Sequence, residues 1–388
     1  MHILLAHNDY GSFSGEEEVM RTISTLLESH GHKITPFRRS SKDIGDSLLK
    51  KMHALFSGIY SFNSRNRIAQ ILNQGGIDIV EVQNLFPFIS PSILPVCKRM
   101  HVPVVMLCPN YRLFCPNGLH LSHGKICERC LGGKEWHCIL QNCERDIFKS
   151  FGYAARNAFA RVTRMITDNV TIFVVLSEFQ KARFIDSGIP PERIAVLPNI
   201  APDVEMSENA SIGDTVSFVG RVSAEKGVNE FLDAARKLPQ LRFAVAGSTE
   251  RMPQVLTDLR PNVAISGFLS GKALDDFFNL SRIMVFPSKW FEGFPTVIAK
   301  AMAHGKPVIA SRMGAIPEIV DNGVTGLLCN PGDVDDLAEK IDYLWKRPDL
   351  CQEMGRAGLE KARKEYSKET VYTKLIKIYE KAVHLDRT

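Results

Sequence analysis

The stretch WFEGFPTVIAKAMAHGKPVIAS, from Trp290 to Ser311, places an acid and a cation around the start of a predicted helix. Glu292 precedes Gly293 just after a strand-like apolar run, and the helix is predicted to begin near Pro295. A carboxylate at such a strand end can accept hydrogen bonds from sugar hydroxyls, while the N–H groups of the first helical turn can face a phosphate. Proline has no N–H, so the turn offers one donor fewer. The alternative is that Glu292 only complements the positive end of the helix.

A second loop carries two cations close to the start of another predicted helix. In the run GRVSAEKGVNEFLDAA, Arg221 and Lys226 flank a short turn that closes on Gly227. Together they can neutralise a diphosphate, arginine through its two-pronged guanidinium and lysine as a point charge. A single cation in such a loop is more often a solvated surface charge. The pair therefore favours a phosphate-binding loop.

The first predicted strand leads into a loop with two glycines, NDYGSFSGEEEV. Gly11 and Gly15 allow the backbone to come close to a phosphate just before a helix begins. No complete Gly-x-Gly-x-x-Gly fingerprint follows, and a plain connecting turn is the commoner explanation of such a pattern.

Short apolar runs alternate with helical patterns along nearly the whole chain of 388 residues, which is typical of parallel sheets with crossover helices. Strands are predicted at 3–8, 33–37, 78–83, 103–108, 171–177 and 194–199, and again at 215–220, 242–247, 263–267, 283–288, 307–311 and 325–329. A polar stretch at 200–213 predicts a hinge between two domains. The fold class is therefore α/β, with two Rossmann-like domains facing each other across a cleft that receives a ligand at the strand ends.

These motifs resemble those of the family 4 glycosyltransferases, which use the two-domain GT-B fold, and the resemblance covers nearly the whole chain. GRVSAEKG is similar to the donor-diphosphate loop of that family, and the block from Glu292 to Leu328 is similar to its signature. The resemblance implies that a nucleotide sugar binds mainly to a C-terminal domain, 204–367, and the acceptor to an N-terminal domain, 1–203. The final helix, 368–388, would complete the N-terminal domain, and hinge closure would assemble the site.

The resemblance also implies roles for single residues. Arg221 and Lys226 would clamp the diphosphate and Glu292 would hold hydroxyls of the transferred sugar, which makes these three the candidate catalytic residues. The other implied donor-binding residues line the phosphates, the sugar turn or the base: Gly15, Gly293, Phe294, Pro295, Thr296, Gly267 and Phe268. Members of the family retain the anomeric configuration and need no catalytic metal, since basic residues and a helix dipole stabilise the departing diphosphate.

Two positions depart from the family pattern. The second glutamate of the signature, usually near the nucleotide ribose, is Lys300 here. Lys300 either reverses the hydrogen-bond directions toward the ribose or adds a third cation near the diphosphate. Pro109 occupies the place of a histidine that contacts the transferred sugar in relatives. Either Asn110 or Tyr111 takes over that contact, or the sugar is held differently, or transfer is weak or absent.

Six of the nine cysteines lie in a glycine-rich insertion, 108–147, that is too short for a core of its own. So many cysteines in a chain expected to be cytoplasmic argue against a disulfide framework, whereas four soft ligands fit a structural zinc. Similar insertions in some relatives keep cysteines at such places, which implies Cys115, Cys127, Cys130 and Cys143 as ligands. Reduced thiols that only pack are the alternative. The insertion is expected to overhang the acceptor side of the cleft.

The charge distribution and the length of the apolar runs indicate where the protein is located and which partners it contacts. The apolar runs are strand-sized, far shorter than the roughly 18 residues of a membrane span, and the N-terminus lacks a signal-peptide pattern. We therefore expect a cytoplasmic protein. Basic residues interleaved with apolar ones from Lys33 to Arg67 predict contact with the anionic inner face of the cell membrane, with a solvated helix as the alternative. No nucleic-acid partner is expected, because no recognisable module accompanies the basic residues.

The sequence thus predicts a retaining hexosyltransferase that moves a sugar from a UDP- or GDP-sugar to a glycan acceptor, of the kind assembled on a lipid carrier for bacterial surfaces. Two alternatives stay open. The first is a catalytically weak or inactive nucleotide-sugar-binding subunit, and the second is a GT-B epimerase without acceptor dependence.

Overall fold

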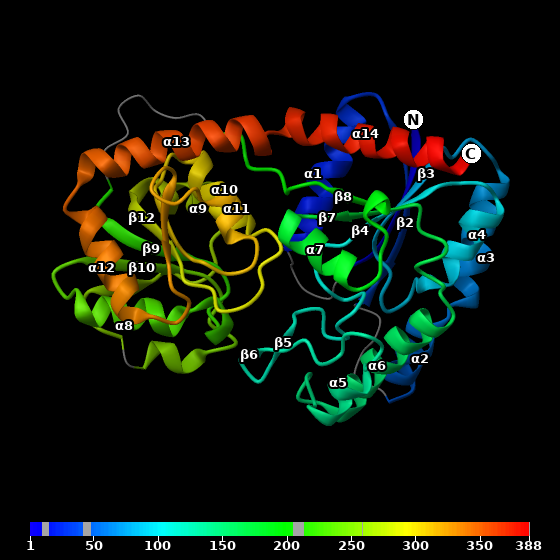
Figure 1. The fold of residues 1–388 in the computed structure, drawn as a ribbon, viewed down its shortest axis with the longest axis horizontal. Helices are drawn as coiled ribbons and strands as arrows, with labels where there is room; N and C mark the ends of the chain where they lie inside the picture. The colour runs from blue at the N-terminus through cyan, green and yellow to red at the C-terminus, as the bar shows by residue number, and fades with distance from the viewer. Residues whose placement is uncertain (10–14, 42–47, 205–212, 258, 388) are drawn as a thin grey trace. The chain divides into compact units, whose positions relative to one another are not determined.

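The computed structural model describes residues 1–9, 15–41, 48–204, 213–257 and 259–387, which form two compact units (Figure 1). The first unit comprises Met1–His123, Cys127–Leu197 and Tyr372–Thr388, and the second comprises Gly124–Ile126 and Pro198–Val371. The predicted boundaries after residues 203 and 367 fall close to these limits. Much of the predicted hinge, 205–212, lies outside the described residues.

The first unit is built on a parallel sheet with the strand order β2-β1-β3-β4-β7-β8. Its strands are β1 (His2–Asp9), β2 (Lys33–Ser40), β3 (Ile79–Asn84), β4 (Val104–Leu107), β7 (Ile172–Val175) and β8 (Ile194–Val196). Its helices are α1 (Gly15–Ser29), α2 (Leu48–Ile59), α3 (Phe62–Asn73), α4 (Leu94–Arg99), α5 (Trp136–Leu140), α6 (Ile147–Val162) and α7 (Glu178–Asp186). Nearly every residue of β3 and β7 is buried, as expected for strands covered on both faces.

The second unit repeats this plan with the order β11-β10-β9-β12-β13-β14, again all parallel. Its strands are β9 (Thr215–Val219), β10 (Arg242–Ala246), β11 (Val263–Ile265), β12 (Ser281–Phe286), β13 (Val308–Ser311) and β14 (Gly326–Cys329). Its helices are α8 (Val228–Lys237), α9 (Gly271–Leu280), α10 (Thr296–Ala303), α11 (Ile316–Ile319), α12 (Val334–Trp345) and α13 (Pro348–Tyr366). Each predicted apolar run forms a strand, so the predicted α/β class with two Rossmann-like domains is confirmed.

The final helix, α14 (Lys368–Arg387), is anchored to the first unit by polar side chains. The Tyr379 hydroxyl donates a hydrogen bond to the carboxylate of Glu81 in β3, and both side chains are buried. Burial raises the pKa of Glu81, while the hydrogen bonds from Tyr379 and Gln83 oppose the shift. The Tyr372 ring stacks on His30 with 3.7 Å between centroids. These contacts attach the final helix to the first unit, to which Tyr372–Thr388 belong.

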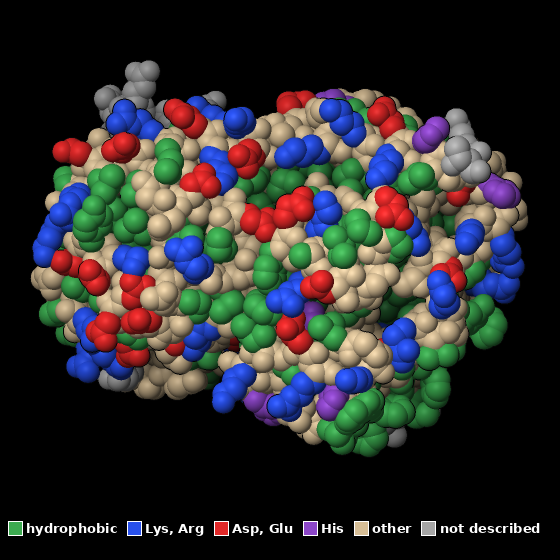
Figure 2. All heavy atoms as spheres, in the orientation of Figure 1, with side chains coloured by type: hydrophobic (Ala, Val, Ile, Leu, Met, Phe, Trp, Pro, Cys, Tyr) green, Lys and Arg blue, Asp and Glu red, His purple; other side chains and the backbone are tan. Residues whose placement is uncertain are grey.

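The cysteine-rich insertion forms small elements that the strand and helix patterns did not predict. They are the hairpin of β5 (Leu121–Ser122) and β6 (Lys125–Ile126) and the short helix α5, which lies against α6. Figure 2 shows hydrophobic side chains gathered at the surface over α2, α5 and α6. Among the described residues, no helix is both long enough and apolar enough to cross a membrane.

Candidate active site

Glu292 is the centre of the polar contacts at the strand ends of the second unit. It lies between β12 and α10 and is only 5% exposed. Its Oε1 accepts hydrogen bonds from Lys226 Nζ at 2.7 Å, Ser288 Oγ at 2.8 Å and Trp290 Nε1 at 2.8 Å. Every hydrogen bond that a described residue donates to this carboxylate ends on Oε1, so Oε2 can accept from a ligand hydroxyl.

Lys226 is held by charge and by an aromatic ring. Its ammonium lies 5.0 Å from the Trp290 ring centroid, in addition to the ion pair with Glu292. An ammonium has three N–H donors, so one can bind Glu292 while another binds a phosphate oxygen. The sequence predicted separate tasks for these two residues, and the structure pairs them directly.

Two glycines let the surrounding loops approach closely. Gly227 has φ +78°, and a Cβ there would lie 1.9 Å from the carbonyl oxygen of Pro287. Gly314 has φ +59°, and its Cβ would lie 2.7 Å from both the backbone N and the backbone O of Glu292. The Ala315 N–H donates to the Glu292 carbonyl at 3.0 Å. The backbone of Glu292 is therefore positioned by the 314–315 turn, which the sequence analysis did not single out.

Arg221 follows β9 and is partly exposed, with Nη2 3.9 Å from Glu225 Oε1. Arg251 Nη1 lies at the same distance, 3.9 Å, from the same oxygen. Burial and then the Arg251 charge lower the pKa of the Arg221 guanidinium, while Glu225 and Glu292 oppose the shift. Arg221 thus lies within electrostatic reach of Glu292, and its role as a diphosphate clamp stays a prediction.

The implied base-binding segment presents an exposed aromatic ring. Gly267 follows β11 with φ +70°, and its carbonyl accepts from the Gly247 N–H at 2.7 Å. Phe268 comes next, and its side chain is exposed. Such a ring offers a stacking surface for a nucleobase.

Some residues of the implied sugar turn contact other parts of the second unit. Phe294 is buried, and its ring meets Tyr366 of α13 edge-on at 5.1 Å. Pro295 is buried at the start of α10, and Thr296 Oγ1 accepts from Asn199 Nδ2 at 3.1 Å. Gly293 is half-buried beside them. The ligand contacts implied for these four residues stay predictions.

Lys300 lies in the second turn of α10, where its carbonyl accepts from the His304 N–H at 3.1 Å. Burial is the main cause of a lowered pKa for His304, and the charges of Lys306 and Lys300 act in the same direction while Asp275 opposes them. Lys300 is therefore close enough to His304 for their charges to interact. Its contact with a ribose stays a prediction.

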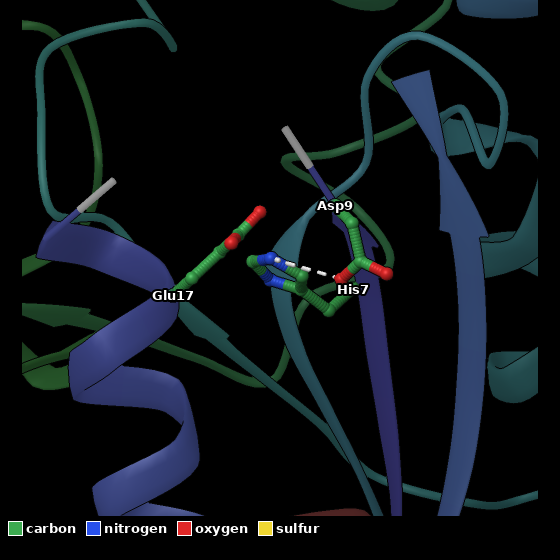
Figure 3. A group of neighbouring side chains, drawn as sticks. All are labelled: His7, Asp9 and Glu17. Atoms are coloured by element: carbon green, nitrogen blue, oxygen red, sulfur yellow. Dashed lines mark ion pairs between the residues drawn. The ribbon is translucent and has the colours of Figure 1, made fainter. Parts of the chain in front are cut away.

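In the first unit, polar side chains that the sequence analysis did not single out meet at the ends of β1 and β2. His7 is buried, and its Nε2 lies 3.7 Å from Asp9 Oδ1, which Arg38 Nη2 approaches to 2.6 Å. Figure 3 shows Glu17 reaching from α1 toward the His7 ring. His7, Asp9 and Glu17 bring their ligand atoms within 4.8 Å of one another, and no other described group of three or more His, Cys, Asp or Glu side chains does so.

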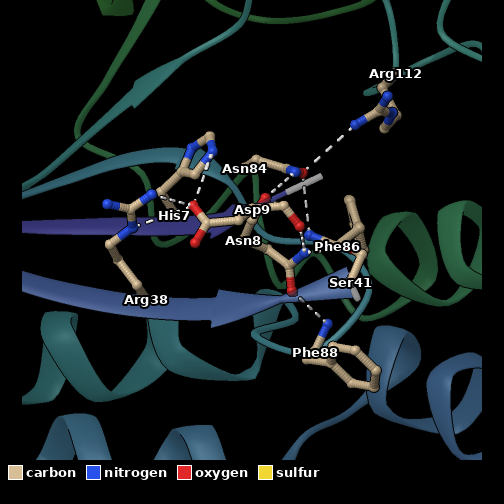
Figure 4. Close-up of polar contacts among 9 residues, drawn as sticks. All are labelled: His7, Asn8, Asp9, Arg38, Ser41, Asn84, Phe86, Phe88 and Arg112. Atoms are coloured by element: carbon tan, nitrogen blue, oxygen red, sulfur yellow. Dashed lines mark hydrogen bonds and ion pairs between the residues drawn. The ribbon is translucent and has the colours of Figure 1, made fainter. Parts of the chain in front are cut away.

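Asparagines join this cluster to β3 (Figure 4). Asn8 Nδ2 donates to Ser41 Oγ at 2.8 Å, and Asn8 Oδ1 accepts from the Phe88 N–H at 3.1 Å. Asn84 Nδ2 donates to the Asn8 carbonyl at 2.7 Å, and Arg112 Nη1 lies 3.5 Å from Asn84 Oδ1. The sequence signal for this cluster is the polar triplet His-Asn-Asp at the end of the first apolar run.

The residues predicted to contact the sugar after β4 have structural partners. Asn110 Oδ1 accepts from the Arg112 N–H at 3.0 Å, which stabilises a turn. Tyr111 is buried, and its ring meets His120 edge-on at 4.7 Å. Their role at a sugar stays a prediction. Gly15 begins α1, whereas Gly11 lies outside the described residues.

The cysteines of the insertion are neighbours without forming a closed metal site. Burial is the main cause that raises the pKa of Cys130 to about 12. The nearby thiols of Cys115, Cys143 and Cys127 act in the same direction. A hydrogen bond with Cys138, which was not among the predicted ligands, is the main cause that lowers the pKa of Cys143 to about 6. Tetrahedral zinc with Zn–S bonds of about 2.3 Å holds sulfurs roughly 3.8 Å apart. No three described cysteine sulfurs come within 4.8 Å of one another, so this arrangement does not fit zinc without movement.

Comparison with known proteins agrees with the geometry of the second unit. Residues 207–361 match the family model described as glycosyl transferases group 1. The chain is 26% identical over 213 residues to the alpha-D-kanosaminyltransferase of Streptomyces kanamyceticus, covering 49% of this chain and 55% of that protein. It is 31% identical over 221 residues to the D-inositol 3-phosphate glycosyltransferase of Mycobacterium sp. (strain JLS), covering 51% of this chain and 50% of that protein. The chain thus spans about half the length of these curated relatives.

A solved structure of Anabaena Alr3699/HepE in complex with UDP and glucose superposes with a TM-score of 0.66 at 18% identity. The match covers 97% of this chain and 98% of that chain. The fold is therefore GT-B, and residues 207–361 of the chain are similar to the glycosyl transferases group 1 family. The finer assignment to family 4 stays a prediction.

Proposed function

We propose that the protein transfers a sugar from a UDP- or GDP-sugar to a glycan acceptor with retention of the anomeric configuration. The observation that carries this proposal is the buried Glu292, whose Oε1 is held by three donors while Oε2 can accept from a sugar hydroxyl. The Anabaena protein of similar fold was solved with UDP and glucose, which supports a UDP-sugar as donor.

In this proposal the charged residues act on the leaving group. Departure of the nucleoside diphosphate builds negative charge on its phosphate oxygens, and preformed cations nearby lower the barrier. Lys226 is held in place by Glu292 and Trp290, and Arg221 lies in the same loop, so both would receive that charge. Phe268 would stack on the base. We expect no catalytic metal, because two cations and the α10 N-terminus supply the positive charge.

The acceptor would bind the first unit at the ends of β1 and β2. A glycan or lipid-linked glycan offers hydroxyl groups, which both donate and accept hydrogen bonds. Asp9 and Glu17 provide acceptors there, and Arg38 provides donors. These groups add to Asn110 and Tyr111, the acceptor-side residues predicted from the sequence.

A thermal-shift screen followed by turnover assays tests the proposal. UDP, GDP and their sugars should raise the melting temperature, and the tighter ligands should raise it more, because they bind the native state. A donor that binds should then lose its sugar to a glycan acceptor. Turnover that is independent of any acceptor would instead indicate an epimerase.

A nucleotide-sugar-binding subunit without catalysis is the second candidate. Pro109 replaces the expected histidine, and the observation that favours this candidate is the structural engagement of Asn110 and Tyr111. Tight nucleotide binding with neither transfer nor donor hydrolysis across a panel of donors and acceptors would support it.

We also propose a structural zinc in the cysteine cluster, separately from the catalytic question. Binding through Cys115, Cys127, Cys130 and Cys143 would require their sulfurs to move together. Metal analysis of the purified protein should find near-stoichiometric zinc, and its absence would show that the thiols only pack.

A further inference from the structure

We infer that one face of the first unit, formed by α2, α5 and α6, docks on an anionic lipid bilayer. Large apolar side chains are exposed on all three helices of this docking face: Met52 and Phe56 on α2, Leu140 on α5, and Ile147, Phe148 and Phe151 on α6. Phe148 is 85% exposed and Leu140 is 68% exposed. Apolar side chains concentrated in this way mark an interaction site.

At its N-terminal end, helix α6 exposes large apolar side chains and buries small or polar ones. A surface helix normally buries large apolar residues and exposes polar ones. Here the buried positions hold small or polar side chains: Ser150, Gly152, Ala154, Arg156, Asn157 and Ala160. Phe148, Phe151 and Ile147 are exposed instead. Because these side chains are exposed, packing in the core does not explain why they are apolar.

Close helix packing accounts for the small buried residues and makes the face continuous. A Cβ at Gly152 would lie 2.6 Å from Leu55 Cδ1, so α6 approaches α2 closely. On another side, Cys138 of α5 packs with Ala154 of α6. Figure 2 shows the resulting surface as hydrophobic side chains at the lower right, with Lys, Arg and His side chains nearby.

The charge around the docking face is positive. Residues 125–164 contain eight Lys or Arg and four Asp or Glu. Three of those acids are ion-paired, Glu128 with Arg183 at 2.7 Å, Glu135 with Arg161 at 2.7 Å and Glu144 with Lys149 at 2.9 Å, and two of these cations, Arg161 and Lys149, are among the eight.

An apolar face within a basic surround complements an anionic bilayer. The rings would enter the boundary between headgroups and acyl chains, and the cations would face lipid phosphates. A second copy of the chain is a poorer occupant, because it would bring two positive surfaces together. The inference stands on this face alone and does not require the proposed transferase activity.

Sedimentation with vesicles tests the inference. The protein should sediment with phosphatidylglycerol-containing vesicles at low salt and far less with phosphatidylcholine alone. Leu140→Ser should weaken partitioning about threefold to tenfold, the scale of one partly inserted side chain. Leu280→Ser is the matched control, because Leu280 is a leucine of nearly equal exposure, 65%, in the second unit. Equal losses for both variants, or no sedimentation of the wild type, would overturn the inference.

A second measurement follows the face itself. Trp136 is an exposed tryptophan on α5, and the chain has two others, so bromolipid quenching should be present in the wild type and reduced in Trp136→Phe. Phe148→Ser combined with Phe151→Ser should lower vesicle affinity by ten- to hundredfold at unchanged melting temperature. If that variant instead converts a wild-type dimer into a monomer and leaves vesicle binding unchanged, the face is an interface between copies and the inference is wrong.

Discussion

The two sheets have the same six-stranded parallel plan, but the polar groups at their strand ends are organised differently. In the second unit, one buried carboxylate collects three donors from two short loops that were visible in the sequence. In the first unit, the corresponding network spreads over β1, β2, β3 and Arg112, and its central ion pair, Arg38 with Asp9, is partly exposed.

The difference predicts unequal consequences for substitution. A buried ion pair is costly to break because one charge stays in a medium of low polarity, whereas an exposed pair contributes only about 0 to 1 kcal/mol. The Lys226–Glu292 pair belongs to the first kind and the Arg38–Asp9 pair to the second. We therefore expect a preorganised donor site and a more adaptable acceptor site.

The largest effect is expected for Glu292→Gln. The variant keeps the shape of the side chain but removes the charge that holds Lys226 and polarises a sugar hydroxyl. Sugar transfer should fall by about 100-fold or more, the scale of losing one electrostatic contact in an active site, with nearly unchanged nucleotide affinity. Rates with a donor and acceptor, together with calorimetry with the nucleotide, measure both. Wild-type activity in this variant would remove Glu292 from the sugar site.

Gly314→Ala tests whether the 314–315 turn positions Glu292. The new Cβ would lie 2.7 Å from the Glu292 backbone, so the turn must shift. We expect a loss of about 2 to 4 kcal/mol in the free energy of unfolding, from clash and a left-handed backbone together. Gly323→Ala is the control, because Gly323 has φ +83° with no atom within 4 Å of its Cβ position. Denaturant unfolding of both variants separates the effect of the clash from that of the backbone strain. Equal losses in the free energy of unfolding would show that the 314–315 turn moves to accommodate the new Cβ.

Arg221→Ala should weaken nucleoside diphosphate binding by about 1 to 3 kcal/mol, the scale of a charge-assisted hydrogen bond. Arg242→Ala serves as the control, since Arg242 lies at the opposite end of β10 and pairs with Asp214 at 2.7 Å. Calorimetric titration with UDP and GDP gives the difference. An unchanged dissociation constant for Arg221→Ala would refute the clamp.

Asp9→Asn should have the smallest effect on stability, below about 1 kcal/mol, because its partner Arg38 is half exposed. If the first-unit cluster binds the acceptor, the acceptor KM should rise several-fold while UDP affinity stays constant. A change in UDP affinity without a change in acceptor KM would reverse the roles assigned to the two strand ends.

The site residues that could be predicted from the sequence are those whose position in the fold follows from the residues next to them in the chain. Arg221, Lys226 and Glu292 lie in short loops directly after apolar strands, so the parallel sheet brings them to one edge. His7 and Asp9 were missed because their partner Arg38 and neighbour Glu17 come from separate elements. The packing partner of Phe294 was also not visible in its motif, since its ring meets Tyr366, a residue of a distant helix.

The sequence by itself determined the twelve strands, the two-unit plan and the cationic loop, because hydrophobic periodicity and loop chemistry are local properties. Only the tertiary structure decided which partner each charge takes, as when Lys226 turned out to bind Glu292. It also decided that Phe148 and Phe151 of α6 are exposed, since small buried residues of α6 allow α2 and α5 to pack closely against it. Such choices depend on distances between segments far apart in the chain, which periodicity does not encode.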